Sequence, residues 1–161
     1  MRNFRVIIDG FPPREASPNA RVHYMKLHSV KKEQKELMTG LILAQGIPDK
    51  PMDKAHLTIT FESKDKRKRD IDNLLASCKA YIDALVPDVI VDDNAERLSL
   101  SLYYKSKMPE TRIIFELEEQ SEIAPHSIII SAAEYKRLRD IPGIAFPHFI
   151  SKTPHPYNKG K

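Results

Sequence analysis

One apolar stripe at residues 71–86 does most to limit how this chain can fold. Its members recur at the i, i+3, i+4 and i+7 positions of an amphipathic helix, and they are Ile71, Leu74, Leu75, Cys78, Ile82, Leu85 and Val86. Pro87 follows the stripe and ends the predicted helix. Because a helix of this kind buries one face only, it must pack against a sheet or against other helices.

Segments with the period of a strand lie on both sides of this helix. Residues 56–62 alternate between apolar and polar side chains, which predicts a strand with one face exposed to water. Further strands are predicted at residues 4–8, 98–102 and 112–117, with the last two forming an antiparallel pair. The sequence therefore supplies enough strands for a sheet that the helix can cover.

A second helix is predicted at residues 29–45, after an extended loop at 14–28. Ser29 is its expected N-cap, and Gly46 and Pro48 end it. The resulting order of elements is strand, helix, strand, helix, strand, strand. This order predicts an α+β fold in two layers, with a mixed sheet and helices packed on one face.

The composition changes after Gln120, so we expect two parts in the chain. Residues 1–119 are predicted to form one domain and residues 120–161 a C-terminal extension. Within the extension we expect a short strand at 128–130, a helix that opens with a capping box at 131–134, and an irregular basic tail from 146.

Positive charge is concentrated directly before the helix at 71–86. The net charge of +4 and the pI near 9.1 favour an anionic partner only weakly. More informative is a basic segment at residues 64–69, in which Asp65 is the only residue that is not a cation; the cations are Lys64, Lys66, Arg67, Lys68 and Arg69. A segment of this kind is often a solvated loop, but here two aspartates follow it at once.

Those aspartates, Asp70 and Asp72, stand at the start of the predicted helix. Acids at this position can simply cap the helix or complement its dipole, but one of them would be enough for that. Asp93 follows the next apolar segment and is either part of a polar turn or a third member of the cluster. Three carboxylates together would form a hard-oxygen site suited to Mg²⁺ or Mn²⁺.

Lys79 lies seven residues after Asp72, so the two would share one face of a continuous helix. It can then either reach back toward the carboxylates or form an ordinary surface pair with Asp83. Other metal sites do not fit the sequence. An EF-hand loop that began at Asp70 would need glycine at Leu75, and the histidines have no spacing typical of zinc sites.

In order and spacing, these motifs resemble the RusA-type Holliday junction resolvases, which are crossover junction endodeoxyribonucleases. The resemblance rests on Lys-Arg-Asp-Ile-Asp-Asn-Leu at 68–74, Lys-Ala-Tyr-Ile-Asp-Ala-Leu at 79–85 and Asp-Asp at 92–93. The stretch from Phe11-Pro12-Pro13 to His23 is similar to the amino-terminal loop of phage-type members. The resemblance covers about residues 4–117 and does not extend to the C-terminal extension.

The resemblance implies a homodimer that binds branched DNA and cuts symmetric strands of a four-way junction in recombination and repair. It implies Mg²⁺ as cofactor, with Mn²⁺ as a substitute, and assigns the metal to Asp70, Asp72 and Asp93 and the catalytic lysine to Lys79. Some members of the family carry this lysine one helical turn nearer to the aspartates, at the position that Ala76 holds here. Residues expected to contact DNA are Lys64, Lys66, Arg67, Lys68, Arg69, Arg14, Asn19 and Arg21.

Two other functions remain open at this point. The chain could bind branched DNA without cutting it, or it could be a nuclease for flaps, forks or single strands. The single cysteine, Cys78, excludes an internal disulfide and fits a reducing cytoplasm. No apolar run is long enough to cross a bilayer, so we expect no membrane partner.

Overall fold

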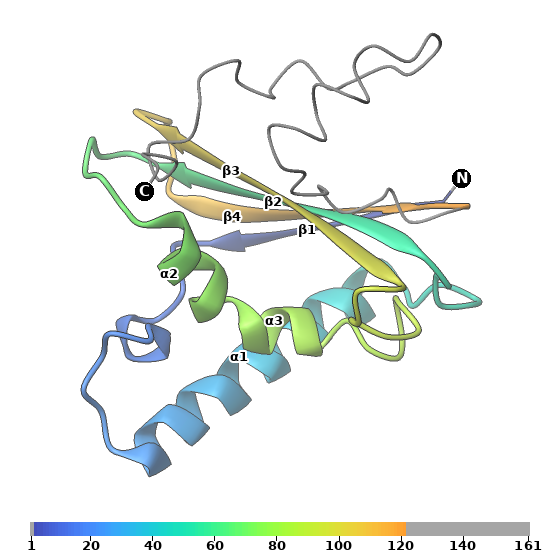
Figure 1. The fold of residues 1–161 in the computed structure, drawn as a ribbon, viewed down its shortest axis with the longest axis horizontal. Coiled ribbons are helices and arrows are strands. Elements are labelled where there is room, and N and C mark those ends of the chain that lie inside the picture. Colours follow the sequence, from blue (N-terminus) through green and yellow to red (C-terminus); the bar gives the residue numbers. More distant parts are fainter. Residues whose placement is uncertain (1, 122–161) are drawn as a thin grey trace, which may run out of the picture. The chain divides into compact units, whose positions relative to one another are not determined.

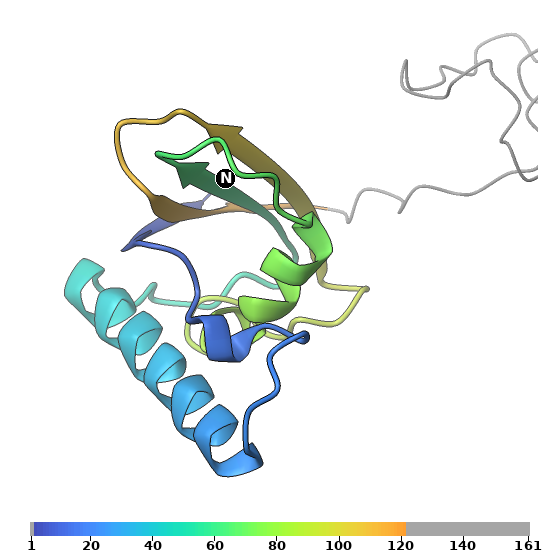
Figure 2. The same cartoon turned by 90° about the vertical axis from the view of Figure 1, so that its left-hand side faces the viewer.

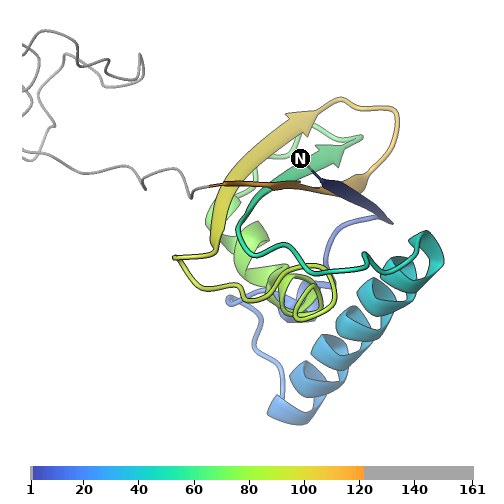
Figure 3. The same cartoon turned by 90° about the vertical axis from the view of Figure 1, so that its right-hand side faces the viewer.

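The computed structural model describes residues 2–121, in which a four-stranded mixed sheet carries helices on one face (Figures 1, 2 and 3). The strands are β1 (Asn3–Asp9), β2 (Ala55–Ser63), β3 (Leu98–Ser106) and β4 (Arg112–Glu119), and their order in the sheet is β1-β4-β2-β3. β4 is antiparallel to both β1 and β2, whereas β3 is parallel to β2. The predicted α+β class, with a mixed sheet covered by helices, is confirmed.

The predicted antiparallel pair of β3 and β4 is wrong, because β2 lies between them. Ile59 in β2 is opposite Leu102 of β3 on one side and opposite Phe115 of β4 on the other. The predicted water-exposed face of β2 is also wrong in part, since Thr60 and Glu62 are buried. A central strand is hydrogen-bonded along both edges and largely covered, which the alternation of its residues alone does not reveal.

The first long helix, α1 (Tyr24–Gln45), begins five residues before its predicted start. Its N-cap is His23 and not the predicted Ser29. The ring Nδ1 of His23 accepts a hydrogen bond from the backbone N–H of Met25. The stretch predicted as an extended loop also contains a short 3₁₀ helix, η1 (Arg14–Ala16). The early turns of α1 are mostly exposed and lack apolar periodicity, so their pattern gives no helical signal. The predicted end is confirmed, with Gly46 at a φ of 93° that favours glycine.

The helix predicted at 71–86 is divided into α2 (Ile71–Ser77) and α3 (Lys79–Asp83). Most of its apolar stripe is covered as expected: Cys78, Ile82 and Leu85 join the core formed by the sheet and α1. Leu74, Leu75 and Val86 are partly buried against that core, whereas Ile71 at the start of the stripe is exposed. Burial raises the pKa of the Cys78 thiol to about 12, which keeps it neutral. The predicted packing is therefore confirmed although the helix is not continuous.

The predicted strand at 128–130, helix from 131 and tail from 146 lie outside the described residues, as does nearly all of the predicted extension at 120–161. No helix among residues 2–121 has both the length and the apolar character needed to cross a membrane.

Candidate functional site

Asp70 and Asp72 stand at the exposed start of α2, directly after the basic segment. Asp70 is the N-cap residue and has an extended backbone, but its carboxylate makes no capping hydrogen bond to the helix. Instead its Oδ2 accepts from the side-chain amide of Asn73 at 3.3 Å, while Asp72 Oδ1 accepts from the backbone N–H of Asn73 at 2.9 Å. These bonds engage one oxygen of each carboxylate, so each keeps a second oxygen for a ligand.

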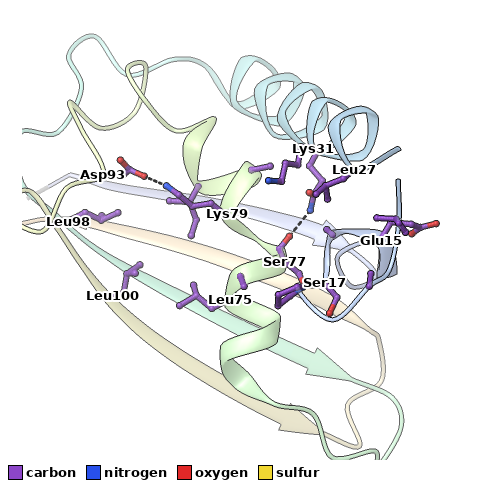
Figure 4. Close-up of a pocket in the computed structure, with 18 residues that line it drawn as sticks. Glu15, Ser17, Leu27, Lys31, Leu75, Ser77, Lys79, Asp93, Leu98 and Leu100 are labelled. Atoms are coloured by element: carbon purple, nitrogen blue, oxygen red, sulfur yellow. Dashed lines mark hydrogen bonds and ion pairs between the residues drawn. The ribbon is translucent and has the colours of Figure 1, made fainter. Parts of the chain in front are cut away.

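Lys79 is the first residue of α3, and its ammonium group joins two acids. Its Nζ lies 2.5 Å from Asp83 Oδ1 and also donates to Asp93 Oδ2, the contact drawn as a dashed line in Figure 4. Asp83 and Asp93 both raise the pKa of Lys79. Lys79 therefore remains protonated at neutral pH, and the stabilisation from its ion pairs is lost only when the pH rises through this raised pKa.

Of the two alternatives for Lys79, the pair with Asp83 is formed. Lys79 does not share one continuous helix with Asp72, because the helix is interrupted at Cys78. In a continuous helix, the Ser77 carbonyl would accept from the N–H of Tyr81. Here it accepts from the side-chain Nε2 of Gln34 on α1 at 2.9 Å, and the Tyr81 N–H donates to the Cys78 carbonyl instead. Gln34 thus donates to the Ser77 carbonyl, which in a continuous helix would accept from Tyr81. Lys79 begins a new helix, α3, and its side chain contacts Asp93.

Gln34 is a residue that the sequence analysis missed. It is buried, and its Oε1 has no hydrogen-bond partner in the described part of the chain. A signal was available, because Gln34 falls in the i, i+4 series of buried residues on α1, with Val30 before it and Met38 and Ile42 after it. A lone polar residue within an apolar stripe indicates a specific partner across the interface.

The structure distributes the predicted site over two hollows. Lys79 and Asp93 line a largely apolar cavity of about 560 Å³ (Figure 4), whereas Asp70 lines a smaller one of about 300 Å³. Ser17 and Ser77 line both, so the two hollows adjoin at these residues. The predicted residues thus come from neighbouring surfaces, with Lys79 and Asp93 in direct contact.

The carboxylates of Asp70, Asp72 and Asp93 are the ligand type that Mg²⁺ prefers. However, among residues 2–121 no three His, Cys, Asp or Glu side chains are grouped closely enough to hold a metal ion. Asp93 is engaged by Lys79, while Asp70 and Asp72 are held near Asn73. The donor chemistry fits the predicted metal, and the three acids would have to move together to bind it.

Arg69 was predicted to contact DNA, but its guanidinium is engaged within the protein. It donates to both oxygens of Asp65 at 2.8 Å and to Tyr104 Oη at 2.9 Å, and it lies 4.7 Å from the ring centroid of Phe11. The donations from Arg69 to Asp65, with one from the backbone N–H of Arg67, hold the pKa of Asp65 well below its usual range. Arg69 therefore anchors the basic segment beside Asp70, while the Arg67 side chain stays 82% exposed.

Because the Arg69 side chain is engaged and the Lys68 side chain is exposed, we predict different effects for substitutions at these two neighbouring positions. Lys68→Ala removes an exposed cation and is expected to lower the salt slope of junction binding by about one. Arg69→Ala should mainly lower the melting temperature, because it breaks the contacts to Asp65 and Tyr104. Fluorescence anisotropy at several salt concentrations, together with thermal unfolding, measures both effects. A full unit of slope lost in Arg69→Ala without any change in melting temperature would contradict the anchoring role.

The other residues predicted to contact DNA lie around η1 and the loop that follows it. Arg14, Asn19 and Arg21 line one open hollow of about 610 Å³. Arg14 also lines the smaller hollow with Lys68 and Asp70. The amino-terminal loop and the basic segment therefore approach the start of α2 from two sides, although they are far apart in the sequence.

No protein-family model matches this chain, and no curated protein matches it in sequence. The resemblance to the RusA-type resolvases therefore rests on the quoted motifs. What the residues themselves offer is a pair of exposed carboxylates, a protonated lysine on a third acid, and cations around them.

Proposed function

We propose that this chain is an Mg²⁺-dependent endonuclease that cuts four-way DNA junctions by phosphodiester hydrolysis. The observation that carries the proposal is the contact between Lys79 and Asp93. The resemblance assigns these two residues to one active site, and they lie fourteen positions apart in the sequence. Their direct pairing at the start of α3 supports a common catalytic role.

In this proposal Asp70, Asp72 and Asp93 hold Mg²⁺. The bound ion would supply Lewis-acid stabilisation of the phosphate and would lower the pKa of a water molecule. Lys79 contributes positive charge at neutral pH, because its raised pKa keeps it protonated. It therefore donates hydrogen bonds to a phosphate oxygen and stabilises negative charge as it develops, and it does not act as a base.

Asp83 has a supporting role in the same proposal. Lys79 bonds to Asp83 as well as to Asp93, so Lys79 would keep one partner if Asp93 served as a metal ligand. The i, i+4 spacing of Lys79 and Asp83 keeps this second contact within α3 itself. Asp83 thereby holds the ammonium group near the acids throughout the reaction.

The exposed cations of the basic segment would contact DNA phosphates and orient the scissile strand. Such contacts give affinity and position but do not read the sequence. Because a four-way junction has approximate two-fold symmetry, a homodimer of this chain would present one site to each of two strands. We propose the homodimer and a cytoplasmic location as parts of the same hypothesis.

A branched-DNA-binding protein without cleavage is the second candidate. One observation favours it: Asp70, Asp72 and Asp93 do not converge on a common point within the described residues. In that case the carboxylates would shape the protein surface, and only the cations would act on DNA. A nuclease for flaps, forks or single strands is a variant of the first proposal and would use the same residues.

Gel-resolved cleavage of a labelled four-way junction and a matched linear duplex, with Mg²⁺ or with chelator, tests the proposal. Paired symmetric nicks in the junction alone, dependent on Mg²⁺, are the expected result. Tight junction binding without cutting would favour the second candidate. Equal cutting of flaps, forks or duplex would point to a nuclease of broader use.

A further inference from the structure

One flank of α1 carries a row of basic side chains that faces α3. His28, Lys31, Lys32 and Lys35 line a groove of about 350 Å³ together with Lys79 of the candidate site. The acids in the lining are Glu36 and Asp83. Lysines thus outnumber acids in the groove by four to two, and none of these α1 residues belongs to the basic segment or to the loop around η1.

The row follows from the geometry of α1. His28 and Lys35 are seven residues apart, close to two full turns, and Lys31 lies between them on the same side. This flank borders the buried stripe of Val30, Gln34 and Met38, so it remains beside α3 as the helix packs. The row is therefore held against the candidate site by the same contacts that hold the core.

The groove continues into the cavity of the candidate site. Lys31 and Lys79 line both the basic groove and the apolar cavity that contains Asp93. Figure 4 shows these two lysines on neighbouring helices, with Lys79 directed at Asp93. A ligand that extends along α1 would accordingly reach the Lys79–Asp93 pair at one end.

The positive charge of the groove is only partly neutralised within the protein. The Nζ of Lys35 lies 3.8 Å from Oδ2 of Asp83, and the Nζ of Lys32 lies 3.8 Å from Oε1 of Glu36. Both lysine side chains are exposed. Lys31 forms no ion pair with any residue between 2 and 121. Because Lys31 and Lys35 are like charges at i and i+4, they repel each other, and an anion in the groove would relieve that repulsion.

We propose that this groove is a second phosphate-binding track, which holds the backbone of a DNA strand as it approaches Lys79 and Asp93. The proposal rests on the proposed function in taking DNA as the ligand. From residue 28 to residue 35 the row extends for about 10 Å along the helix, which suits a chain of phosphates better than a single ion. Lysines act as point charges, so the track would hold the backbone whatever its sequence.

Junction binding by the Lys31→Gln/Lys35→Gln double variant tests the track. Binding of a labelled four-way junction is measured in chelator over a range of salt concentrations, so that cleavage plays no part. The salt slope is expected to fall by about two in the double variant. Lys26→Gln is the matched control, because Lys26 is an exposed lysine of α1 that does not line the groove. Its slope should equal that of the wild type.

The charge-preserving variant Lys31→Arg/Lys35→Arg should restore the wild-type slope. An unchanged slope in the glutamine variant, or an equal loss in Lys26→Gln, would overturn the proposal. The proposal would also be overturned if the glutamine variant kept the wild-type slope but differed from the wild type in its sedimentation without DNA. That result would make the groove a protein interface. If the slope falls as expected but the wild type cuts no junction, the track stands and the nuclease proposal fails. If the wild type cuts the junction but the glutamine variant keeps the wild-type slope, the nuclease proposal stands and the track fails.

Discussion

Replacing Asp72 with Asn is expected to abolish Mg²⁺-dependent cutting of a four-way junction while the protein still binds the junction. Asp72 is exposed in the first turn of α2, and among residues 2–121 its carboxylate accepts a hydrogen bond only from the adjacent backbone N–H of Asn73. Asparagine retains a side-chain oxygen for that contact but loses the negative charge that a metal ligand needs. Substituting a residue that only supports a metal ligand lowers metal affinity or activity roughly 10–100-fold, so substituting a direct ligand should lower activity further.

The measurement is the single-turnover rate of junction cleavage, with binding followed separately in chelator. Asp88→Asn is the matched control, because Asp88 is also exposed and lies outside both hollows of the candidate site. It should cut at the wild-type rate. Normal turnover by Asp72→Asn would remove this residue from the metal site, and equal losses in both variants would indicate a general effect of charge.

Replacing Gln34 with Leu is expected to slow cleavage by at least about tenfold, because it removes the donor that keeps α2 and α3 apart. The Ser77 carbonyl would then be free to accept from the N–H of Tyr81, as in a continuous helix. Lys79 would turn with the extended helix and lose its contact with Asp93. A factor of ten corresponds to about 1.4 kcal/mol in the barrier, a modest effect for a displaced catalytic cation.

The effect on folding should be smaller than the loss of a buried hydrogen bond usually implies. A Ser77 carbonyl left without a partner would cost about 1–3 kcal/mol, and pairing with the Tyr81 N–H avoids this cost. The substitution also removes the Gln34 Oε1, which is buried without a partner in the described part of the chain, and this offsets part of the cost. Thermal unfolding is therefore expected to show only a small decrease in stability.

A readout beyond activity separates positioning from general damage. Because Asp83 and Asp93 raise the pKa of Lys79, loss of the Asp93 contact should lower that pKa in Gln34→Leu, measured by NMR titration of the lysine side chain. Gln45→Leu, at an exposed position in the last turn of α1, is the control and should leave both the pKa and the rate unchanged. An unchanged Lys79 pKa in Gln34→Leu would show that Gln34 does not position the lysine.

The amino-acid sequence by itself determined the fold class and the identity of most candidate residues. Period-2 alternation located β2, and the apolar stripe at 71–86 correctly placed Cys78, Ile82 and Leu85 in the core. These signals are local, because the choice between exposed and buried depends on the spacing of residues along one element. The charges of Asp70, Asp72 and the basic segment are likewise visible in the sequence.

Only the tertiary structure decided which elements pair and where the functional side chains point. β2 lies between β3 and β4, although β3 and β4 are consecutive in the sequence. At the division of α2 from α3, the Ser77 carbonyl accepts a hydrogen bond from Gln34, which lies forty-three residues earlier in the sequence. Arg69 and Arg67 look alike in the basic segment. The guanidinium of Arg69 donates to Asp65 and Tyr104 and lies over Phe11, whereas that of Arg67 is 3.9 Å from Asp65 and its side chain is 82% exposed. Each of these outcomes follows from a contact between distant residues. The local pattern of a sequence can indicate that a partner exists, as it does for Gln34, but it does not identify that partner.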